Sequence, residues 1–265
     1  AWEALLEKNR EESKTQRFDN YELSKTPVAM SILPQPSGSI LGRIAAHLLP
    51  GSCLLCSADC AGALLCAHCV ADLPQLPNAS CPQCCVETTL GERCGACLKE
   101  PPAFVHTIAL FRYEFPVDRL IQALKYGHQL QLANWFGQCL SRKTLAAGHD
   151  LILPLPLHPS RLQSRGFNQS TEIARTISRE LHMQMDTSCL IRTRATPPQA
   201  ALPLKERARN VRGAFECNTD LVGKRILLID DVMTSGSTLR ECARILKLHG
   251  ASQITVAVVA RALRH

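Results

Sequence analysis

The sequence predicts an α/β fold in which helices flank a parallel sheet, preceded by a small cysteine-rich region. Strand-like and helix-like patterns alternate from residue 104 to residue 260, which is typical of a parallel sheet with helical crossovers. The apolar run Ile226–Ile229 is typical of a buried strand, and two adjacent carboxylates and a Thr/Ser/Gly loop follow it. Such loops emerge at the carboxyl ends of parallel strands, where α/β folds bind ligands.

The composition is that of a globular protein. Its 265 residues are enough for one large domain or two smaller ones, and an apolar content of 46% is enough for a sizeable core. Most of the net charge of +7 lies between His158 and Arg225, where Lys and Arg outnumber Asp and Glu by twelve to six. This excess favours an anionic ligand such as a polyphosphate or a nucleic acid, although a solvated basic surface without a partner would have the same composition.

The sequence also predicts where the protein works. It has no run of about 18 apolar residues, so we expect no membrane insertion. Residues 1–29 mix charges of both signs without the apolar core of a secretory signal, which predicts a cytoplasmic protein. In that reducing compartment, paired cysteines bind metal more often than they form disulfides. We expect a foreign or disordered leader, a zinc-ribbon domain and an α/β domain, at residues 1–39, 40–100 and 101–265.

Ahead of the cysteines, the sequence predicts little regular structure. Trp2–Glu12 is expected to form a short helix only if a partner surface buries its apolar side chains, because so short a segment is not stable alone. Ile40–Leu49 is expected to form a short amphipathic helix that ends near Pro50 and Gly51.

A 28-residue repeat of cysteine pairs follows. Each copy holds two Cys-x-x-Cys pairs separated by nine residues. A pair with this spacing presents both sulfurs to one ion, and two pairs complete a closed tetrahedral zinc site with no open catalytic position. Such a ribbon has little apolar core, so zinc would supply its folding free energy. The predicted ligands are Cys53, Cys56, Cys66, Cys69, Cys81, Cys84, Cys94 and Cys97.

The spacing leaves the pairing of these knuckles open. They can combine within each copy or across the two copies, and reduced thiols without metal are the alternative. Cys60 and Cys85 fall outside the repeat and are expected to be spare. The remaining cysteines are expected to be small core residues, namely Cys139, Cys189, Cys217 and Cys242.

The α/β pattern begins after Pro101 and Pro102. Residues 190–213 interrupt it with a stretch that has no clear period. The predicted strands are Phe104–Arg112, Leu151–Pro156, Ile226–Ile229 and Ile254–Ala260, and the predicted helices are Val117–Leu124, Leu132–Leu145, Asn168–Leu181 and 237–249.

The acidic pair and the loop after it form the first candidate site. Neighbouring side chains at a strand end point in different directions, so one of Asp230 and Asp231 can reach two ribose hydroxyls while the other orients the loop or a metal-bound water. The loop offers backbone N–H groups and hydroxyls to a phosphate at the start of the next helix. A simple N-cap turn is the alternative, but it needs only one such side chain. The predicted loop residues are Thr234, Ser235, Gly236, Ser237 and Thr238.

This string resembles the phosphoribosyl pyrophosphate (PRPP) motif of type I phosphoribosyltransferases. The resemblance implies a phosphoribosyltransferase-like sheet in which Asp230 and Asp231 bind the ribose hydroxyls and the loop binds the 5′-phosphate. It also implies Mg²⁺, which accompanies the pyrophosphate in that family. Met233 departs from the pattern, because a smaller or branched residue is common at this position.

A second string runs from Pro154 to Arg161 and from Arg165 to Gln169, and it resembles the signature of the ComF family. That family also carries an N-terminal zinc domain, so the resemblance spans about Gly51–Arg261. The loop in this string holds two guanidinium groups, of Arg161 and Arg165, which are suited to clamp a pyrophosphate bidentately. Stacking or salt bridging at the surface is the alternative.

Three further residues match the ComF pattern. Arg207 and Asn210 stand in an Arg-x-x-Asn pattern within the basic stretch 191–215, which is expected to close over the ligand and add positive charge around the leaving pyrophosphate. A solvated basic loop is the alternative. Lys125 is expected either to contact a base or phosphate, or simply to end its helix favourably with the macrodipole.

Three classes of function stay open. A phosphoribosyltransferase, a member of the glycosyltransferase class, would let a nitrogen nucleophile displace pyrophosphate, with Arg161, Arg165 and Arg207 around the leaving group. A non-catalytic module would instead bind PRPP and single-stranded DNA, since ComF relatives are associated with natural competence and DNA uptake. The zinc ribbons would serve as docking modules for other competence or helicase proteins in the third class.

Overall fold

The computed structural model of the chain describes residues 51–60, 62–145, 148–195 and 209–263. Within these ranges, no helix has the length and apolar composition needed to cross a membrane. The expected leader at residues 1–39, the expected helices Trp2–Glu12 and Ile40–Leu49, and Arg207 all lie outside the described residues.

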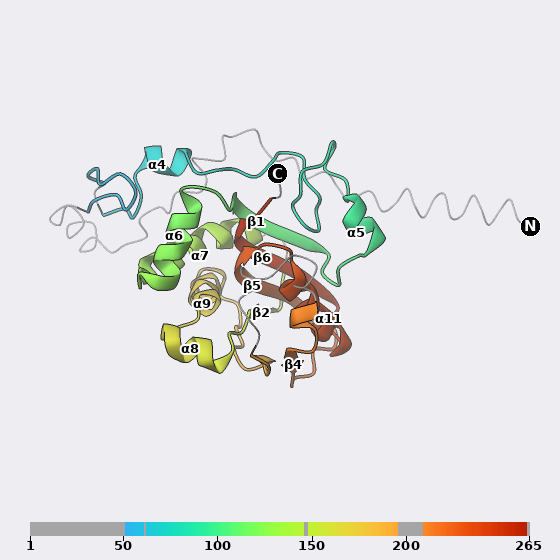
Figure 1. Cartoon of the computed structure of the whole chain (residues 1–265). Coiled ribbons are helices and arrows are strands. Elements are labelled where there is room, and N and C mark those ends of the chain that lie inside the picture. Colours follow the sequence, from blue (N-terminus) through green and yellow to red (C-terminus); the bar gives the residue numbers. More distant parts are fainter. Residues whose placement is uncertain (1–50, 61, 146–147, 196–208, 264–265) are drawn as a thin grey trace, which may run out of the picture. The chain divides into compact units, whose positions relative to one another are not determined.

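A four-stranded sheet runs through the α/β region (Figure 1). Its order is β1-β6-β5-β2, and every neighbouring pair is parallel, so the predicted parallel sheet is confirmed. β5 and β6 are buried along most of their length, as expected for strands that are covered on both faces. The strands are β1 (His106–Arg112), β2 (Leu151–Pro154), β5 (Arg225–Met233) and β6 (Gln253–Arg261).

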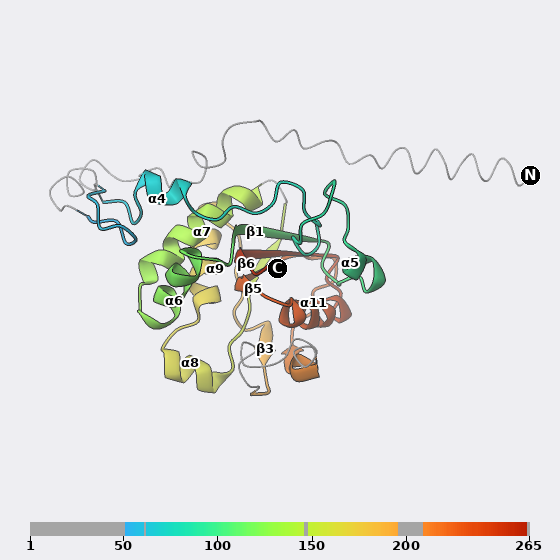
Figure 2. The ribbon, with the colours of Figure 1, turned by 45° about the horizontal axis from the view of Figure 1, so that its top comes forward.

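Helices cover both faces of this sheet (Figures 1 and 2). α6, α7 and α9 pack on one face, whereas α11 packs on the other. The side chains of β5 alternate between the two cores: Leu227 and Ile229 belong to the core under α6, α7 and α9, and Ile226 and Leu228 belong to the core under α11. The helices are α6 (Val117–Tyr126), α7 (Leu130–Thr144), α9 (Gln169–Leu181) and α11 (Ser237–Leu248).

Three short elements differ from the sequence-based expectation. Pro159–Arg165 forms a helix, α8, where a loop is expected; the His158 side chain caps its start, and Gly166 in a left-handed conformation ends it. β3 (Leu190–Arg192) and β4 (Phe215–Cys217) form an antiparallel hairpin within the stretch that shows no period. Strands of three residues are too short to produce a recognisable alternation.

The cysteine-rich region packs against both cores of the sheet. Cys53 belongs to the core under α6, α7 and α9, whereas Cys81, Cys84 and Cys97 belong to the core under α11. A short helix begins at the second cysteine pair of each repeat copy. These helices are α4 (Ala67–Ala71) and α5 (Gly95–Lys99).

Candidate functional site

The carboxyl edge of the sheet brings together the residues that follow β2 and β5. β2 pairs with β5 in a register that places Pro154 beside Ile229, so the α8 segment and the acidic pair start from neighbouring points. Asp230 and Asp231 lie within β5 rather than after it, because the strand continues to Met233 alongside the long apolar β6.

Asp230 is buried and is held by groups at the start of α9. The Ser170 hydroxyl donates to Asp230 Oδ1 at 3.0 Å, and the amide of Asp231 donates to the same oxygen at 2.9 Å. Asn168 fixes this helix start, because its Oδ1 accepts from the Ser170 amide at 3.0 Å and its Nδ2 donates to the Leu155 carbonyl at 2.9 Å. Burial, and then the neighbouring charge of Asp231, raise the pKa of Asp230 to about 8.

Asp231 forms an ion pair with Lys125, which comes from the end of α6. Burial alone would raise the pKa of Asp231, but the Lys125 ammonium beside it brings that pKa below its usual value. Burial also opposes the charged form of Lys125, yet the Asp231 charge leaves the pKa of Lys125 raised. The two adjacent carboxyl groups therefore differ, since Asp231 stays charged and Asp230 tends to hold a proton. Lys125, whose role the sequence leaves open, has a carboxylate partner.

The loop Thr234–Thr238 turns from β5 into α11. Gly236 has a φ of 76°, in the left-handed region that favours glycine. The hydroxyls of Ser235 and Ser237 are 2.9 Å apart, and the Ser237 amide donates to Ser235 Oγ at 3.3 Å. α11 begins directly at this turn. The first amides and the positive dipole end of a helix make such a turn suitable for a phosphate.

The two arginines predicted to clamp a pyrophosphate lie on α8 rather than in a loop. The Arg165 guanidinium lies 5.1 Å from the centroid of the Tyr126 ring and donates to Gln169 Oε1 at 2.7 Å. Arg161 lies one turn earlier, near enough to Arg192 that its charge, after burial, lowers the pKa of Arg192. Contact between these arginines and a pyrophosphate stays a prediction.

Two residues of this edge escape the sequence analysis, namely Ser170 and Arg261, whereas Arg192 belongs to the basic stretch 191–215 but lies in a strand rather than in a loop. Arg192 of β3 is buried, and its guanidinium lies 5.2 Å from the centroid of the Phe215 ring in β4. Arg261 ends β6 and donates to the Met233 carbonyl at 2.9 Å, just before the loop. Only Ser170 has a sequence signal, because it lies two residues after the Asn168 helix cap.

The eight predicted metal ligands form two separate clusters. The sulfur atoms within each cluster all lie within 4.8 Å of one another, so the cysteine pairs combine within each repeat copy. The sulfurs of Cys56 and Cys66 are 3.7 Å apart, and those of Cys84 and Cys94 are 3.5 Å apart. Both clusters fit zinc, since Zn–S bonds of about 2.3 Å give a tetrahedron with edges of about 3.8 Å. Cluster 1 is Cys53, Cys56, Cys66 and Cys69, and cluster 2 is Cys81, Cys84, Cys94 and Cys97.

The other cysteines serve as hydrogen-bonding or core residues. Cys60 donates to the Ala63 carbonyl at 2.8 Å, and Cys85 donates to the Thr107 carbonyl at 3.2 Å, so neither belongs to a cluster. The four cysteines that the sequence assigns to the core are all buried, namely Cys139, Cys189, Cys217 and Cys242.

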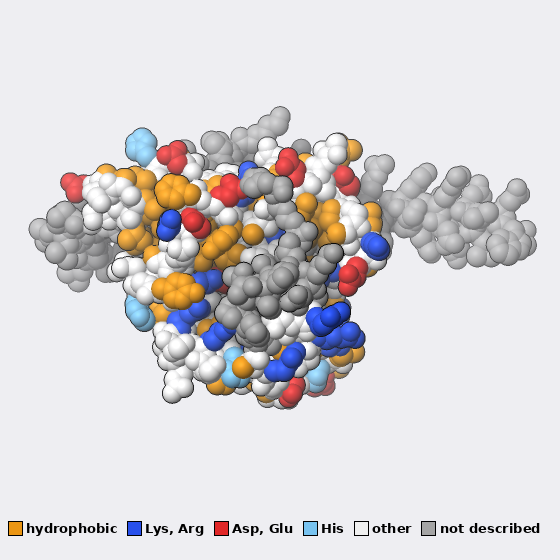
Figure 3. All heavy atoms as spheres, in the orientation of Figure 1, with side chains coloured by type: hydrophobic (Ala, Val, Ile, Leu, Met, Phe, Trp, Pro, Cys, Tyr) orange, Lys and Arg blue, Asp and Glu red, His pale blue; other side chains and the backbone are white. Residues whose placement is uncertain are grey.

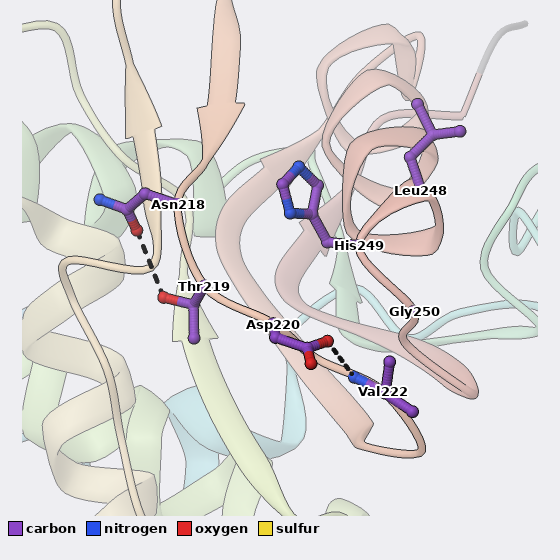
Figure 4. Close-up of a pocket in the computed structure, with 7 residues that line it drawn as sticks. All are labelled: Asn218, Thr219, Asp220, Val222, Leu248, His249 and Gly250. Atoms are coloured by element: carbon purple, nitrogen blue, oxygen red, sulfur yellow. Dashed lines mark hydrogen bonds between the residues drawn. The ribbon is translucent and has the colours of Figure 1, made fainter.

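Basic side chains lie on the face of the molecule that carries α8 (Figure 3). Figure 3 shows Lys and Arg side chains around α8 and around α11 and β4. A separate hollow lies at the opposite end of the sheet, between the segment that leads into β5 and the end of α11 (Figure 4). Its lining includes Asp220 and His249 but no Lys or Arg. A phosphate would find no strong counter-charge in that hollow.

Comparison with known proteins connects these features to a family. A model of the phosphoribosyl transferase domain matches residues 152–264. The DNA utilization protein YhgH of Escherichia coli (strain K12) is 33% identical over 225 residues, which cover 81% of this chain and 99% of that protein. Competence protein F of Haemophilus influenzae is 30% identical over 213 residues, which cover 75% of this chain and 90% of that protein.

Similarity to solved structures is weaker. A purine phosphoribosyltransferase from Pyrococcus horikoshii aligns with 58% of this chain and 77% of its own, at 18% identity and a TM-score of 0.32, which is too low to support a conclusion. The curated relatives are decisive because they match along nearly their whole length, cysteine region included. The chain belongs to the ComF/YhgH family of competence and DNA utilization proteins, and it carries a phosphoribosyl transferase domain.

Proposed function

We propose that the carboxyl edge of the sheet binds Mg-PRPP and that the protein acts in the uptake of transforming single-stranded DNA in the cytoplasm. One observation carries the proposal: the buried pair Asp230 and Asp231 leads directly into a glycine-dependent turn and the start of α11. Adjacent carboxylates suit the two hydroxyls of a pentose, and the helix start suits its 5′-phosphate. The names of the relatives support the biological setting.

In this proposal, different residues would bind the ribose, the 5′-phosphate and the pyrophosphate of PRPP. Asp230 and Asp231 accept hydrogen bonds from the ribose hydroxyls, and the loop Thr234–Thr238 donates to the 5′-phosphate. α8 supplies Arg161 and Arg165 to the pyrophosphate. Mg²⁺ suits a site of carboxylate and phosphate oxygens, and it would neutralise the charge of the pyrophosphate.

Structural zinc in both cysteine clusters is the second part of the proposal. Four thiolates close the coordination sphere, so the ion would stabilise the fold rather than take part in chemistry. The sulfur–sulfur distances in each cluster support this assignment.

Phosphoribosyl transfer is the activity that this arrangement supports best. A nitrogen nucleophile would form a bond to the anomeric carbon while the bond from that carbon to the pyrophosphate oxygen breaks. The pyrophosphate leaves with the bonding electron pair, and the proton of the nitrogen passes to solvent. Cations around the leaving group, Arg161 and Arg165 among them, stabilise the charge that develops there.

A module without turnover is the second candidate, and the basic excess between His158 and Arg225 favours it. A cationic surface of this kind can follow the backbone of single-stranded DNA. In this form the protein would respond to PRPP and hand DNA to other competence or helicase proteins.

Calorimetry with Mg-PRPP tests the proposed site. Wild-type protein should bind, and Asp230→Asn should weaken binding at least about tenfold because asparagine cannot form the carboxylate that binding favours at this position. Asp150→Asn should keep the affinity, since Asp150 pairs with Arg225 at the opposite end of β5 at 2.8 Å. Absence of binding to the wild type contradicts the proposal.

The pKa of Asp230 adds a second readout. Because burial and Asp231 raise this pKa to about 8, binding that favours the carboxylate should release a proton and strengthen as the pH rises towards 8. Heats measured in buffers of different ionisation enthalpy report that proton. Because folding raises this pKa from 3.8 to about 8, Asp230 lowers the free energy of unfolding progressively as the pH rises from about 4 to about 8, so Asp230→Asn should not lower Tm at pH 8.

Turnover separates the two candidates. Pyrophosphate release that depends on an added amine acceptor, and that disappears in Asp230→Asn, supports the transferase. Binding of single-stranded DNA with a steep salt dependence and no turnover supports the module.

A further inference from the structure

Cluster 2 and the phosphate loop are joined by a buried arginine that comes from neither of them. Arg261 lies at the end of β6 and is 6% exposed. Its Nε donates to the Cys84 carbonyl at 2.6 Å, inside the first cysteine pair of cluster 2. Its Nη1 donates to the Met233 carbonyl at 2.9 Å and also to the Thr234 carbonyl, where the loop begins. One rigid guanidinium therefore spans the two sites.

A second arginine makes a similar connection from the far end of the loop. Arg240 lies in the first turn of α11, where its amide donates to the Gly236 carbonyl at 2.9 Å. Its Nη1 donates to the Glu100 carbonyl at 2.8 Å, and its Nη2 lies 3.7 Å from Cys97 Sγ. A cation that donates to a ligand sulfur is favoured when that sulfur carries charge, as it does on a metal.

Packing reinforces both connections. Cys84 and Cys97 belong to the same hydrophobic core as Met233 and Leu239, which flank the loop on either side. Four thiolates around one Zn²⁺ leave two net negative charges, so two arginines against the cluster are electrostatically balanced. Close-packed interiors transmit displacement between neighbouring residues. A planar guanidinium that is hydrogen-bonded at both ends lets cluster 2 and the loop move little relative to each other.

Cluster 1 has different surroundings. In the described part of the chain, its backbone hydrogen bonds are local, for example from Leu54 to the Leu64 carbonyl at 3.0 Å. Its buried ligand, Cys53, belongs to the core on the other face of the sheet. Cluster 1 thus serves as an internal reference for cluster 2.

We propose that metal in cluster 2 and phosphate in the loop Thr234–Thr238 stabilise each other through Arg261 and Arg240, whereas metal in cluster 1 does not. The inference rests on the proposed function, because it needs PRPP to bind at this loop. It makes cluster 2 part of the ligand site: a metal that leaves this cluster releases the loop carbonyls and the first turn of α11 together. By linkage, the ligand must raise the metal affinity by the same factor.

Chelator competition on the full zinc-loaded protein tests this coupling. After equilibration with graded chelator, cysteines are alkylated and each cluster is measured separately by mass spectrometry. Mg-PRPP should raise the chelator concentration that exposes cluster 2 by about 5- to 150-fold, which is the usual range of such coupling. The value for cluster 1 should not change.

Two neighbouring arginines of α11 supply matched variants. Arg240→Met should reduce the effect of Mg-PRPP on cluster 2 to less than about twofold and weaken PRPP binding by the same factor that is lost. Arg244→Met should keep the full effect, since Arg244 lies one turn later and pairs with Glu241 at 2.9 Å. Arg261→Lys keeps the positive charge but lacks the planar guanidinium that donates to Cys84 and to Met233 at the same time, so it should also reduce the coupling.

Calorimetry on the same samples distinguishes the possible failures. If PRPP binds the wild type but leaves the chelator sensitivity of cluster 2 unchanged, the coupling is wrong and the proposed function stands. If the zinc-loaded wild type shows no heat with Mg-PRPP, the proposed function and the coupling fall together. Equal coupling in Arg240→Met and Arg244→Met would also overturn the assignment to Arg240.

Discussion

The two cysteine clusters are copies of one local structure set in different surroundings. In each copy the first cysteine donates its amide to the carbonyl five residues later, at 2.8 Å in both. Each copy also has one residue in the left-handed conformation four positions after that cysteine, Ser57 with a φ of 61° and Cys85 with a φ of 55°. The repeat that is visible in the sequence is therefore a repeat of backbone geometry.

The surroundings differ in depth and in partners. Three ligands of cluster 2 are buried, whereas Cys53 alone is buried among the ligands of cluster 1. Thr107 of β1 also donates to the Gln83 carbonyl at 2.6 Å, within the first cysteine pair of cluster 2. Identical cysteine spacing thus sets the same arrangement of four sulfurs twice, while the packing and hydrogen bonds around the two clusters differ.

Loss of one equivalent ligand from each cluster should give the largest difference between them. Cys84→Ser should lower the free energy of unfolding by more than about 4 kcal/mol, because loss of a structural metal exposes a buried site in the core. Cys56→Ser, at the equivalent exposed position, should lower it by less than about 1 kcal/mol. Urea unfolding followed by far-UV circular dichroism measures both values.

The fluorescence of Trp135 supplies the control for this pair. Trp135 stacks on Phe111 of β1, with ring centroids 6.1 Å apart, and so reports on the core between the sheet and α6, α7 and α9. Cys56→Ser should leave its emission unchanged. Equal destabilisation by the two variants would show that the clusters do not differ in the way their surroundings indicate.

Removal of metal should follow the same order without any substitution. Because three ligands of cluster 1 are partly or fully exposed, a chelator should empty it before cluster 2, at least about tenfold faster. Zinc released to a coloured chelator should appear in two phases of equal size. A single phase would contradict the predicted difference between the clusters. Faster alkylation of Cys84 than of Cys56 would mean that cluster 2 loses its metal first.

Much of the sheet could be predicted from sequence, because its strands are apolar runs that the helices bury on both sides. The acidic pair and the glycine turn are also adjacent in sequence, so their proximity required no tertiary information. Spacing could not decide how the cysteine pairs combine, since every pair has the same two-residue gap. Local hydrogen bonds decide it, as in the short connection from the Cys66 amide to Cys53 Sγ at 3.3 Å.

Contacts between distant parts of the chain could not be predicted. Lys125 and Asp231 are 106 positions apart, and Arg261 and Cys84 are 177 positions apart. In each pair one residue lies near the carboxyl end of a strand, Asp231 in β5 and Arg261 in β6, but its partner comes from helix α6 or from the cysteine region, so the strand pattern does not identify the partner. α8 was predictable in principle from Pro159 and Gly166, but its seven residues carry no buried apolar stripe.

A smaller effect should come from the bond that ties β1 to cluster 2. Thr107→Val keeps the shape of the side chain but removes the donor to the Gln83 carbonyl, so it should cost about 1–3 kcal/mol of unfolding free energy. Chelator sensitivity should rise for cluster 2 and stay constant for cluster 1. Thr176→Val is the matched control, because Thr176 is equally buried but lies on α9. An unchanged chelator sensitivity of cluster 2 in Thr107→Val would contradict the role given to this bond.

The smallest effect should come from glycine substitution of the left-handed residue in each repeat copy, and the change in unfolding free energy should have opposite signs in the two copies. Glycine relieves a left-handed conformation, which costs other residues about 1–2 kcal/mol, but it adds about 0.4–1 kcal/mol of unfolded-state entropy. Ser57 is exposed and loses little else, so Ser57→Gly should stabilise the zinc-loaded protein by up to about 1 kcal/mol. Cys85 is 5% exposed and donates to the Thr107 carbonyl, so Cys85→Gly should destabilise it by about 1 kcal/mol. Urea unfolding of the two variants gives both signs directly, and equal signs would mean that the common backbone geometry outweighs the different surroundings.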